Sequence, residues 1–431
     1  MVIINRQKYL DKLISKIDNG MIKVITGIRR CGKSFLLFEL FYDYLLEQGV
    51  SEDCIIKIAL DDMENEALLD PHILSAYISD HIRDKSKHYY VFLDEIQFAI
   101  TQEELKDRDS YVRLYGVLNG LLRKRNVDVY VTGSNSKFLS SDIITEFRGR
   151  GDEIRMYPLS FREFSSAYPG SEEDAWEDYY TYGGLPLILT RETDEEKAEY
   201  LINLFQKVYL SDIIDRHKIR NREELDELVD ILASAVGSLT NPLKLSKTFK
   251  SVKNKTISDK TLKKYIDYLT DAFLVSKAVR YDIKGRKYIG SPTKFYFEDV
   301  GLRNARLDFR QTEENHIMEN IIYNELRIRG YRVDVGLVEI FGKNSENKTE
   351  KKHLEVDFVA TKGSEKYYIQ SAFAMPTDEK RKQEERPLNA IGDSFKKIIV
   401  VKDNIKPRRD EMGIVTMGIR RFLLNKNSLE L

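Results

Sequence analysis

Four residues early in the chain have the types and the spacing that bind the phosphates of a nucleotide. The run MIKVITGIRRCGKSFLLFE places Gly27, Gly32, Lys33 and Ser34 in the pattern G-x-x-x-x-G-K-[ST]. A glycine-rich turn lets successive backbone N–H groups face one anion at a helix N-terminus, which is itself partly positive. Lys33 is expected to reach the β- and γ-phosphates, and the Ser34 hydroxyl to bind Mg²⁺. The other predicted nucleotide-binding residues of this loop are Ile28, Arg29, Arg30, Cys31 and Phe35.

The residues on both sides supply the elements that must position this loop. The apolar, β-branched run 22–25 predicts a strand that leads in, and 34–46 predicts a helix that leads out. A lysine at the start of an ordinary helix is the alternative explanation of the pattern. A strand and a helix in register favour a loop that binds a nucleoside triphosphate, ATP, together with Mg²⁺.

A second stretch, YYVFLDEIQ at 89–97, predicts a buried strand that ends in two carboxylates. Open α/β sheets bind their ligands at the carboxyl ends of the strands. Asp94 is therefore expected to hold Mg²⁺, directly or through water, and Glu95 to orient or polarise the attacking water. A strand-end turn would explain Asp-Glu taken alone. Its place about sixty residues after the phosphate loop favours the catalytic interpretation.

Two further stretches each allow two explanations. The predicted strand VDVYVTGS ends in polar residues, so Thr132, Ser134 or Asn135 could contact the γ-phosphate. Gly-Ser-Asn also makes a good turn and helix cap by itself. In FRGRG, Arg150 could stabilise transition-state charge on the nucleotide of a neighbouring subunit, and a solvated charge pair with Arg148 is the alternative.

Composition limits the class of protein. A chain of 431 residues predicts two to four domains. The net charge is −1, so any affinity for nucleic acid has to come from a local basic patch. Cys31 and Cys54 are the two cysteines, which favours a reducing compartment. Residues 1–20 contain charges throughout and no apolar stretch, and the chain has no run of about 18 uncharged apolar residues. We therefore expect a cytoplasmic protein without a signal peptide or a membrane span.

Strands and helices alternate from 21 to 156, which is typical of a doubly wound parallel sheet. The ordered runs GIRRCGKS, FLDEIQ, YVTGSNSKFLSS, FRGRG, YPLSFREF and YGGLP resemble those of prokaryotic AAA+-like ATPases that carry a C-terminal domain of unknown function. The resemblance covers nearly the whole chain. It implies an ATPase module, a winged-helix segment and a nuclease-like tail. By similarity, 27–34 correspond to Walker A, Asp94 and Glu95 to Walker B, Ser134 and Asn135 to the sensor region, and Arg150 to the family's Gly-Arg step.

The segment after residue 222 is strongly basic. Helices are predicted at 223–238, 241–252 and 259–273, followed by a hairpin of 274–281 and 287–297, which is the winged-helix arrangement. Residues 241–296 contain fourteen Lys or Arg and four Asp, a local excess of 14 − 4 = +10. This patch predicts binding to duplex DNA, with Lys263 and Lys264 at the major groove and Lys284, Arg286 and Lys287 at phosphates. Docking of a protein and a merely solvated face are the alternatives.

The C-terminal segment contains the layout of a restriction-endonuclease-like metal site. Glu319 falls on a predicted helix at 315–329, Asp357 on a strand at 354–360, and Gln370 on a strand at 366–371. In active sites of this kind the carboxylates hold Mg²⁺ and a lysine steadies the nucleophile. Here Gln370 stands at the second acid position and Ala372 at the lysine position, so we expect a degenerate site without nuclease activity. A lysine from elsewhere in the chain could substitute.

The expected fold is α/β throughout: a P-loop NTPase domain at 1–165 with a doubly wound parallel sheet, a helical lid or connector at 166–221, a winged-helix domain at 222–303, and a degenerate restriction-endonuclease-like domain at 304–431. The expected function is a Mg²⁺-dependent ATPase that couples its nucleotide state to nucleic-acid or partner binding. A nucleotide-dependent protein switch with negligible turnover and an ATP-gated nuclease are the alternatives. A homo-oligomer is compatible with each of these functions.

Overall fold

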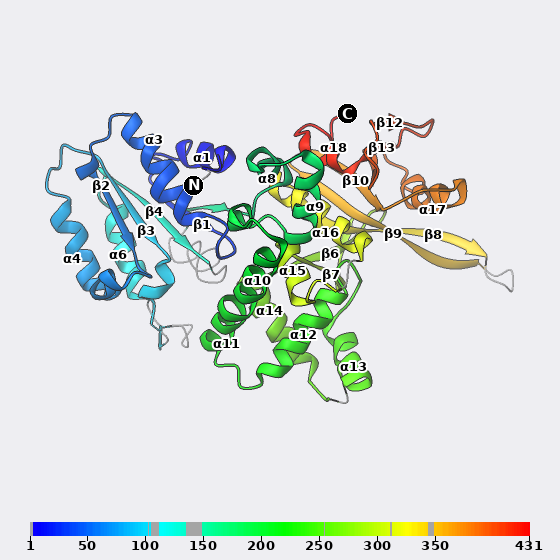
Figure 1. Ribbon diagram of the computed structural model, residues 1–431, viewed down its shortest axis with the longest axis horizontal. Coiled ribbons are helices and arrows are strands. Elements are labelled where there is room, and N and C mark those ends of the chain that lie inside the picture. Colours follow the sequence, from blue (N-terminus) through cyan, green and yellow to red (C-terminus); the bar gives the residue numbers. More distant parts are fainter. Residues whose placement is uncertain are drawn as a thin grey trace. The chain divides into compact units, whose positions relative to one another are not determined.

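The chain folds into two compact units (Figure 1). The first unit comprises Met1–Pro158 with Asp271–Phe273, and the second comprises Leu159–Thr270 with Leu274–Leu431. The structure, a computed structural model, describes residues 3–101, 103–104, 112–134, 149–253, 255–310, 313–343 and 349–431. In these ranges no helix has the length and apolar character needed to cross a membrane.

The first unit is built on a parallel sheet. Its described strands form one five-stranded sheet in the order β2-β3-β4-β1-β5, and every neighbouring pair is parallel. The strands are β1 (Ile22–Thr26), β2 (Ile55–Ala59), β3 (Tyr89–Asp94), β4 (Val127–Gly133) and β5 (Gly151–Arg155). The predicted doubly wound α/β fold is confirmed. Strand β5 had not been singled out from the sequence.

Helices cover both faces of this sheet. The helical elements described are α1 (Gln7–Ile14), α2 (Lys33–Phe35), the π-helix η1 (Leu36–Phe41), α3 (Tyr42–Glu47), η2 (Glu52–Cys54), η3 (Met63–Leu69), α4 (Pro71–His81), η4 (Ile96–Ala99) and α6 (Arg113–Leu122). Apolar residues of α4 and α6 share one core with alternate strand residues. On the opposite face Phe41 packs against Phe92 and Tyr130, with ring centroids 5.7 and 4.8 Å apart. This packing anchors the helix that follows the phosphate loop on β3 and β4.

The second unit contains a mixed sheet. Among its described residues, eight strands pair in the order β12-β13-β11-β10-β9-β8-β6-β7. These strands are β6 (Val275–Asp282), β7 (Lys287–Phe297), β8 (Arg332–Lys343), β9 (Thr349–Lys362), β10 (Glu365–Ala372), β11 (Lys396–Val401), β12 (Arg408–Arg409) and β13 (Val415–Gly418). The predicted hairpin is present as β6 and β7, which are antiparallel.

In the sequence of the second unit, helices occur before, between and after the strands. They are α8 (Phe161–Ala167), α9 (Glu172–Tyr182), η6 (Pro186–Thr190), α10 (Asp194–Leu204), η7 (Phe205–Leu210), α11 (Ser211–His217), α12 (Arg222–Ser234), α13 (Pro242–Lys253), α14 (Asp259–Asp271), α15 (Val300–Arg306), α16 (Glu314–Ile328), α17 (Asp378–Asn389) and α18 (Ile419–Leu424). Ser160, Ser171 and Thr193 begin α8, α9 and α10 with capping boxes, which explains where these helices start.

The hairpin β6–β7 belongs to the same sheet as the C-terminal strands. Strand β6 pairs in parallel with β8, and the Ile283 N–H donates to the Leu337 carbonyl at 3.0 Å. One sheet therefore runs across the predicted boundary between 303 and 304. The four domain ranges themselves stay a prediction.

Candidate nucleotide-binding site

The phosphate loop, Gly27–Ser34, lies at the carboxyl end of β1, where the sequence predicts it. Its glycines are required by geometry. Gly27 has φ +147°, and a Cβ at this position would lie 2.1 Å from the Met156 carbonyl oxygen. Gly32 has φ +99° and directly precedes helix α2. Both values fall where residues with a side chain are strained, so glycine allows the loop to turn tightly against Met156.

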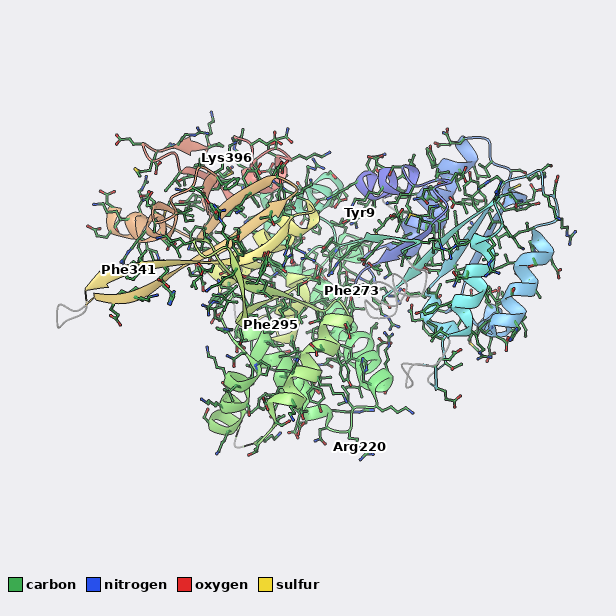
Figure 2. The ribbon with its side chains drawn as sticks, turned by 180° about the vertical axis from the view of Figure 1, so that it is seen from behind. Tyr9, Arg220, Phe273, Phe295, Phe341 and Lys396 are labelled. Carbon is green, nitrogen blue, oxygen red and sulfur yellow. The ribbon has the colours of Figure 1, made fainter. Side chains whose placement is uncertain are left out.

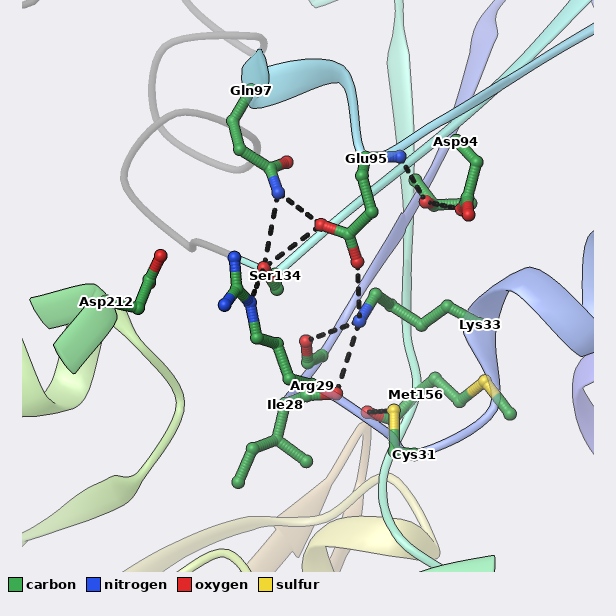
Figure 3. Close-up of polar contacts among 12 residues, drawn as sticks. Ile28, Arg29, Cys31, Lys33, Asp94, Glu95, Gln97, Ser134, Met156 and Asp212 are labelled. Carbon is green, nitrogen blue, oxygen red and sulfur yellow. Dashed lines mark hydrogen bonds and ion pairs between the residues drawn. The ribbon is translucent and has the colours of Figure 1, made fainter. Parts of the chain in front are cut away.

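The side chain of Lys33 curls back over the loop (Figure 3). Its Nζ donates to the carbonyl oxygens of Gly27 at 3.1 Å and Ile28 at 3.2 Å, and it lies 3.6 Å from Glu95 Oε1. Lys33 itself is only 3% exposed. The loop therefore holds a buried cation at the position where the pattern predicts contact with phosphate. Of the remaining loop residues, Ser34 and Arg30 are exposed, Arg29 and Phe35 half-buried, and Ile28 and Cys31 buried.

Asp94 ends strand β3 and is fixed from two sides. Thr132 on the neighbouring strand β4 donates its hydroxyl to Asp94 Oδ1 and accepts the Glu95 N–H at 3.0 Å. Burial raises the pKa of the Asp94 carboxyl above its ordinary value, and the nearby hydroxyls of Ser34 and Thr132 oppose this effect. Ser34 and Asp94, the two predicted Mg²⁺ ligands, are thus brought together as a pair of oxygen donors, which is the donor type that Mg²⁺ takes.

Glu95 has an unusual backbone and a well-defined side chain. Its φ is +50°, in the left-handed region, where strain is typical of functional positions. Its carboxylate accepts hydrogen bonds from Ser134 Oγ at 3.1 Å and from Gln97 Nε2, beside Lys33. Burial favours the protonated form, but Lys33 and these hydrogen bonds hold the pKa of Glu95 below its ordinary value. The structure therefore keeps Glu95 ionised.

Of three further residues around this network, two were not assigned to the site from the sequence alone. Gln97 bonds both Glu95 and Ser134, the latter at 3.3 Å, and it falls within the same run as the carboxylates. Thr132 was one of three alternatives at the end of its strand. No local sequence motif includes Arg6. Its guanidinium donates to the carbonyls of Cys31 at 3.2 Å and Tyr157 at 2.7 Å. Arg6 therefore ties the loop to the segment after β5.

The structure does not test two of the predicted site residues, Asn135 and Arg150. Asn135 lies outside the described residues. Arg150 directly precedes β5, and its carbonyl accepts the Ile22 N–H at 3.0 Å. Ile22 is the first residue of β1, whereas the phosphate loop follows the last residue of β1. Arg150 therefore lies at the amino ends of the strands, and the phosphate loop of the same chain lies at their carboxyl ends. A role on the nucleotide of a neighbouring subunit stays a prediction.

Cys31 is expected to resist alkylation in the folded protein. Its Sγ lies 3.9 Å from the Met156 carbonyl, the side chain is fully buried, and burial raises the pKa of the thiol. Because the thiolate is the reactive form, native labelling by N-ethylmaleimide should be at least about tenfold slower than in urea. Peptide mass spectrometry measures this at each cysteine, with the buried Cys54 as an internal comparison. Rapid native labelling of Cys31 that ATP prevents would contradict the buried placement.

The parallel sheet, the loop after β1 and the carboxylates at the end of β3 define a P-loop fold. Residues 19–165 match the family described as an AAA domain, and residues 173–313 match a domain of unknown function (DUF8612). The chain is 34% identical over 404 residues to an uncharacterized protein of Haemophilus influenzae, covering 92% of this chain and 93% of that protein. This chain therefore belongs to the same family as the Haemophilus protein.

Other proteins are more distantly similar. An uncharacterized protein of Methanocaldococcus jannaschii is 28% identical over 407 residues, covering 91% of this chain and 82% of that one. The ORC1 protein of Aeropyrum pernix, solved in complex with DNA, has a TM-score of 0.29 at 13% identity over 71% of this chain and 92% of its own. AMPPCP-bound DnaA from Aquifex aeolicus has a TM-score of 0.30 at 13% identity, over 61% and 86%. Such low TM-scores carry no weight for the activity of this chain.

The candidate nucleic-acid residues form two groups in the second unit, and all five are exposed. Lys263 and Lys264 lie on α14. Lys284 and Arg286 lie in the turn between β6 and β7, and Lys287 begins β7. Lys284 Nζ donates to the Glu339 carbonyl of β8 at 2.9 Å. The turn is therefore fastened to the neighbouring strand.

The three candidate nuclease residues occupy α16, β9 and β10 as predicted. Glu319 and Asp357 both contact Lys294 of β7, whereas Gln370 contacts the Asp357 N–H at 3.4 Å and Glu384 at 3.3 Å. The structure places a lysine from elsewhere in the chain at this site, which is the alternative that the sequence left open. Although Ala372 is apolar, a lysine arrives from strand β7, which is far away in the sequence.

Proposed function

We propose that this protein is a Mg²⁺-dependent ATPase of the AAA+ type whose nucleotide state controls binding to duplex DNA or to a protein partner. The observation that carries the proposal is the convergence of Lys33, Asp94 and Glu95 at the carboxyl ends of β1 and β3. Membership of the family and the AAA domain support it. Each of these side chains has the chemistry that its proposed step needs.

Each residue of the site has a separate role in the proposed reaction. Lys33 and the N–H groups of the loop hold the phosphates, while Ser34 and Asp94 hold Mg²⁺, which neutralises charge on the phosphate oxygens when bound. Glu95 accepts a proton from, or orients, the attacking water. Ser134 and Gln97 position the Glu95 carboxylate, and Ser134 links it to Arg29 Nε at 3.3 Å. This link gives the loop and the catalytic carboxylate a common hydrogen-bond network.

Steady-state phosphate release tests the proposal. The full chain is expected to hydrolyse ATP with Mg²⁺ and to stop when EDTA removes the metal. The assay is repeated with and without duplex DNA, because a coupled ATPase changes its rate when the partner binds. Tight ATP binding with no turnover under any of these conditions would favour the protein switch with negligible turnover.

The proposed DNA contact rests on the predicted winged helix, whose helices and hairpin correspond to α12, α13, α14 and β6–β7, together with the exposed basic side chains of this segment. Phosphate contacts release condensed counterions, so log affinity for duplex DNA falls linearly with log salt. Replacing Lys284, Arg286 and Lys287 together by glutamine should reduce this slope by about 0.9 for each lost contact, with little change in sequence preference. Fluorescence anisotropy at several salt concentrations measures the slope.

A matched control removes the same charge elsewhere in the second unit. Lys406, Arg408 and Arg409 are also exposed, and their replacement by glutamine should leave the slope unchanged. If instead both triple variants bind DNA as weakly as the parent at physiological salt, the basic face docks a protein. We further propose that the protein works in the cytoplasm and that a homo-oligomer brings Arg150 to a neighbouring nucleotide.

A further inference from the structure

A buried charge cluster in the second unit takes no part in the proposed ATPase. It lies between helix α16 and strands β7 and β9, and we call it the carboxylate cluster. Its members are Lys294, Glu319, Glu355 and Asp357. Figure 2 labels Phe295, the neighbour of Lys294 on β7. Glu319 and Asp357 are also the residues of the predicted degenerate nuclease site.

Lys294 lies at the centre of the three carboxylates. Its Nζ is 2.9 Å from Glu319 Oε1, 2.8 Å from Glu355 Oε1 and 3.2 Å from Asp357 Oδ1. A lysine ammonium has three N–H donors and no acceptor, so each N–H has one carboxylate as its partner. The ammonium group is therefore fully coordinated by side-chain oxygens.

The surroundings hold the carboxylates in place. Tyr296 donates its hydroxyl to the same Glu319 oxygen at 2.6 Å, and the Ser371 N–H donates to Asp357 Oδ2 at 2.9 Å. The backbone at Gly237 approaches Glu319 so closely that an added Cβ would lie 2.8 Å from Oε2. Lys294 is 2% exposed, whereas the side chain of Glu355 is 34% exposed, so the cluster meets solvent at Glu355.

The charges of the cluster depend on Lys294. Three converging carboxylates repel one another, and burial removes the water that would otherwise screen them. Burial also favours a neutral lysine, yet the three carboxylates raise the pKa of Lys294 well above its ordinary value. Burial raises the pKa of Glu319 to about 7, against the opposing effect of Lys294. The ammonium is thus the charge that allows these carboxylates to lie together.

Carboxylate oxygens also bind another kind of cation. Carboxylates from three side chains are a ligand set for Mg²⁺ or Mn²⁺. An ammonium group and a divalent ion cannot share the space between them, because they would repel each other at contact distance. Among the residues that the structure describes, no group of three or more His, Cys, Asp or Glu is arranged for a metal ion. The carboxylates are arranged around the lysine instead.

We propose that the Lys294 ammonium is the resident cation of the carboxylate cluster, and that the cluster binds a divalent metal ion only when Lys294 is removed. Strand β7 thereby closes a metal site that α16 and β9 would otherwise form. The proposal assigns to Lys294 the exclusion of metal from this part of the chain. It does not depend on ATP hydrolysis by the first unit.

Mn²⁺ binding to the nucleotide-free full chain tests the proposal. Lys294→Met keeps the length of the side chain and removes its charge, so the unfolding temperature should fall by roughly 5–15 °C without metal. Isothermal titration should then show one Mn²⁺ site that the parent lacks. Saturating Mn²⁺ should restore several degrees of the loss. Lys277→Met, at an exposed lysine on the adjacent strand β6, should show neither effect.

Two further variants make the outcome decisive. Lys294→Met combined with Asp357→Asn should lose the new Mn²⁺ site, because one ligand is gone. If Lys294→Met does not fold, Lys294→Met with Glu355→Gln has one fewer carboxylate to repel the other two and should still bind Mn²⁺ through Glu319 and Asp357. Mn²⁺ binding by the parent that Asp357→Asn abolishes would overturn the proposal. So would folded Lys294 variants that bind no more Mn²⁺ than the parent.

Discussion

Replacing Glu95 with glutamine is expected to leave ATP bound while slowing its hydrolysis by about a hundredfold or more. The amide has nearly the same shape as the carboxylate and keeps one oxygen for the hydrogen bonds from Ser134 and Gln97. It cannot take a proton from water, and it carries no charge to orient one. Lys33 also loses its ionic partner at 3.6 Å, so affinity for ATP should be unchanged or higher.

Two measurements separate these effects. Phosphate release under saturating Mg²⁺ and ATP gives the turnover, and calorimetric titration with ATP gives the affinity. Glu66→Gln, at an exposed position of the first unit, is the matched control and should behave as the parent does. Turnover by Glu95→Gln within a few fold of the parent would remove Glu95 from the mechanism.

The local parts of this fold could be predicted from the sequence with good accuracy. Helix α16 is predicted at 315–329 and observed at Glu314–Ile328, and the predicted strand 287–297 is β7. Both depend on the periodicity of neighbouring residues, which the sequence displays directly. The phosphate loop and the two carboxylates of β3 were likewise predictable, because a strand and a turn place them without help from distant residues.

Contacts between distant residues were beyond such prediction. Lys294 meets Asp357 across 63 positions, and Arg6 meets Tyr157 across 151. Neither lysine nor arginine stands in a local pattern that points to its partner. The same reason explains why the pairing of the hairpin β6–β7 with β8 was not predicted. Its pairing with β8 depends on sheet order, which alternation of apolar residues within one strand does not encode.

The helix after the phosphate loop also differs from its prediction, to a smaller extent, where it packs against distant residues. The sequence predicts one helix over 34–46, whereas the structure divides it into α2, the π-helix η1 and α3. Apolar residues of this segment are buried in the structure, as expected for the predicted helix. Phe41 ends the π-helix and packs between Phe92 and Tyr130. The change to a π-helix therefore occurs where this segment packs against the sheet. Intrinsic helix propensity does not predict such a change.

Replacing Lys33 with alanine is expected to abolish ATP binding while the protein stays folded. Lys33 is a buried cation whose Nζ lies over the carbonyls of Gly27 and Ile28, in the loop that would surround the phosphates. Without Lys33, the phosphates of bound ATP would lose their charged partner. Loss of one partner of a buried charge pair weakens binding by about 2–5 kcal/mol, so the dissociation constant for ATP should rise about a hundredfold or more. Glu95 keeps its bonds to Ser134 and Gln97 in the variant, which preserves the site.

Calorimetric titration with ATP, in parallel with thermal unfolding, distinguishes lost binding from lost folding. The control is Lys85→Ala, which removes an exposed lysine of the first unit and should bind ATP as the parent does. Lys33→Ala should unfold within a few degrees of the parent when neither protein has nucleotide, and ATP should stabilise the parent alone. Equal affinity for ATP in the parent and in Lys33→Ala would show that the phosphates are held elsewhere. The loop Gly27–Ser34 would then not be the nucleotide-binding site of this chain.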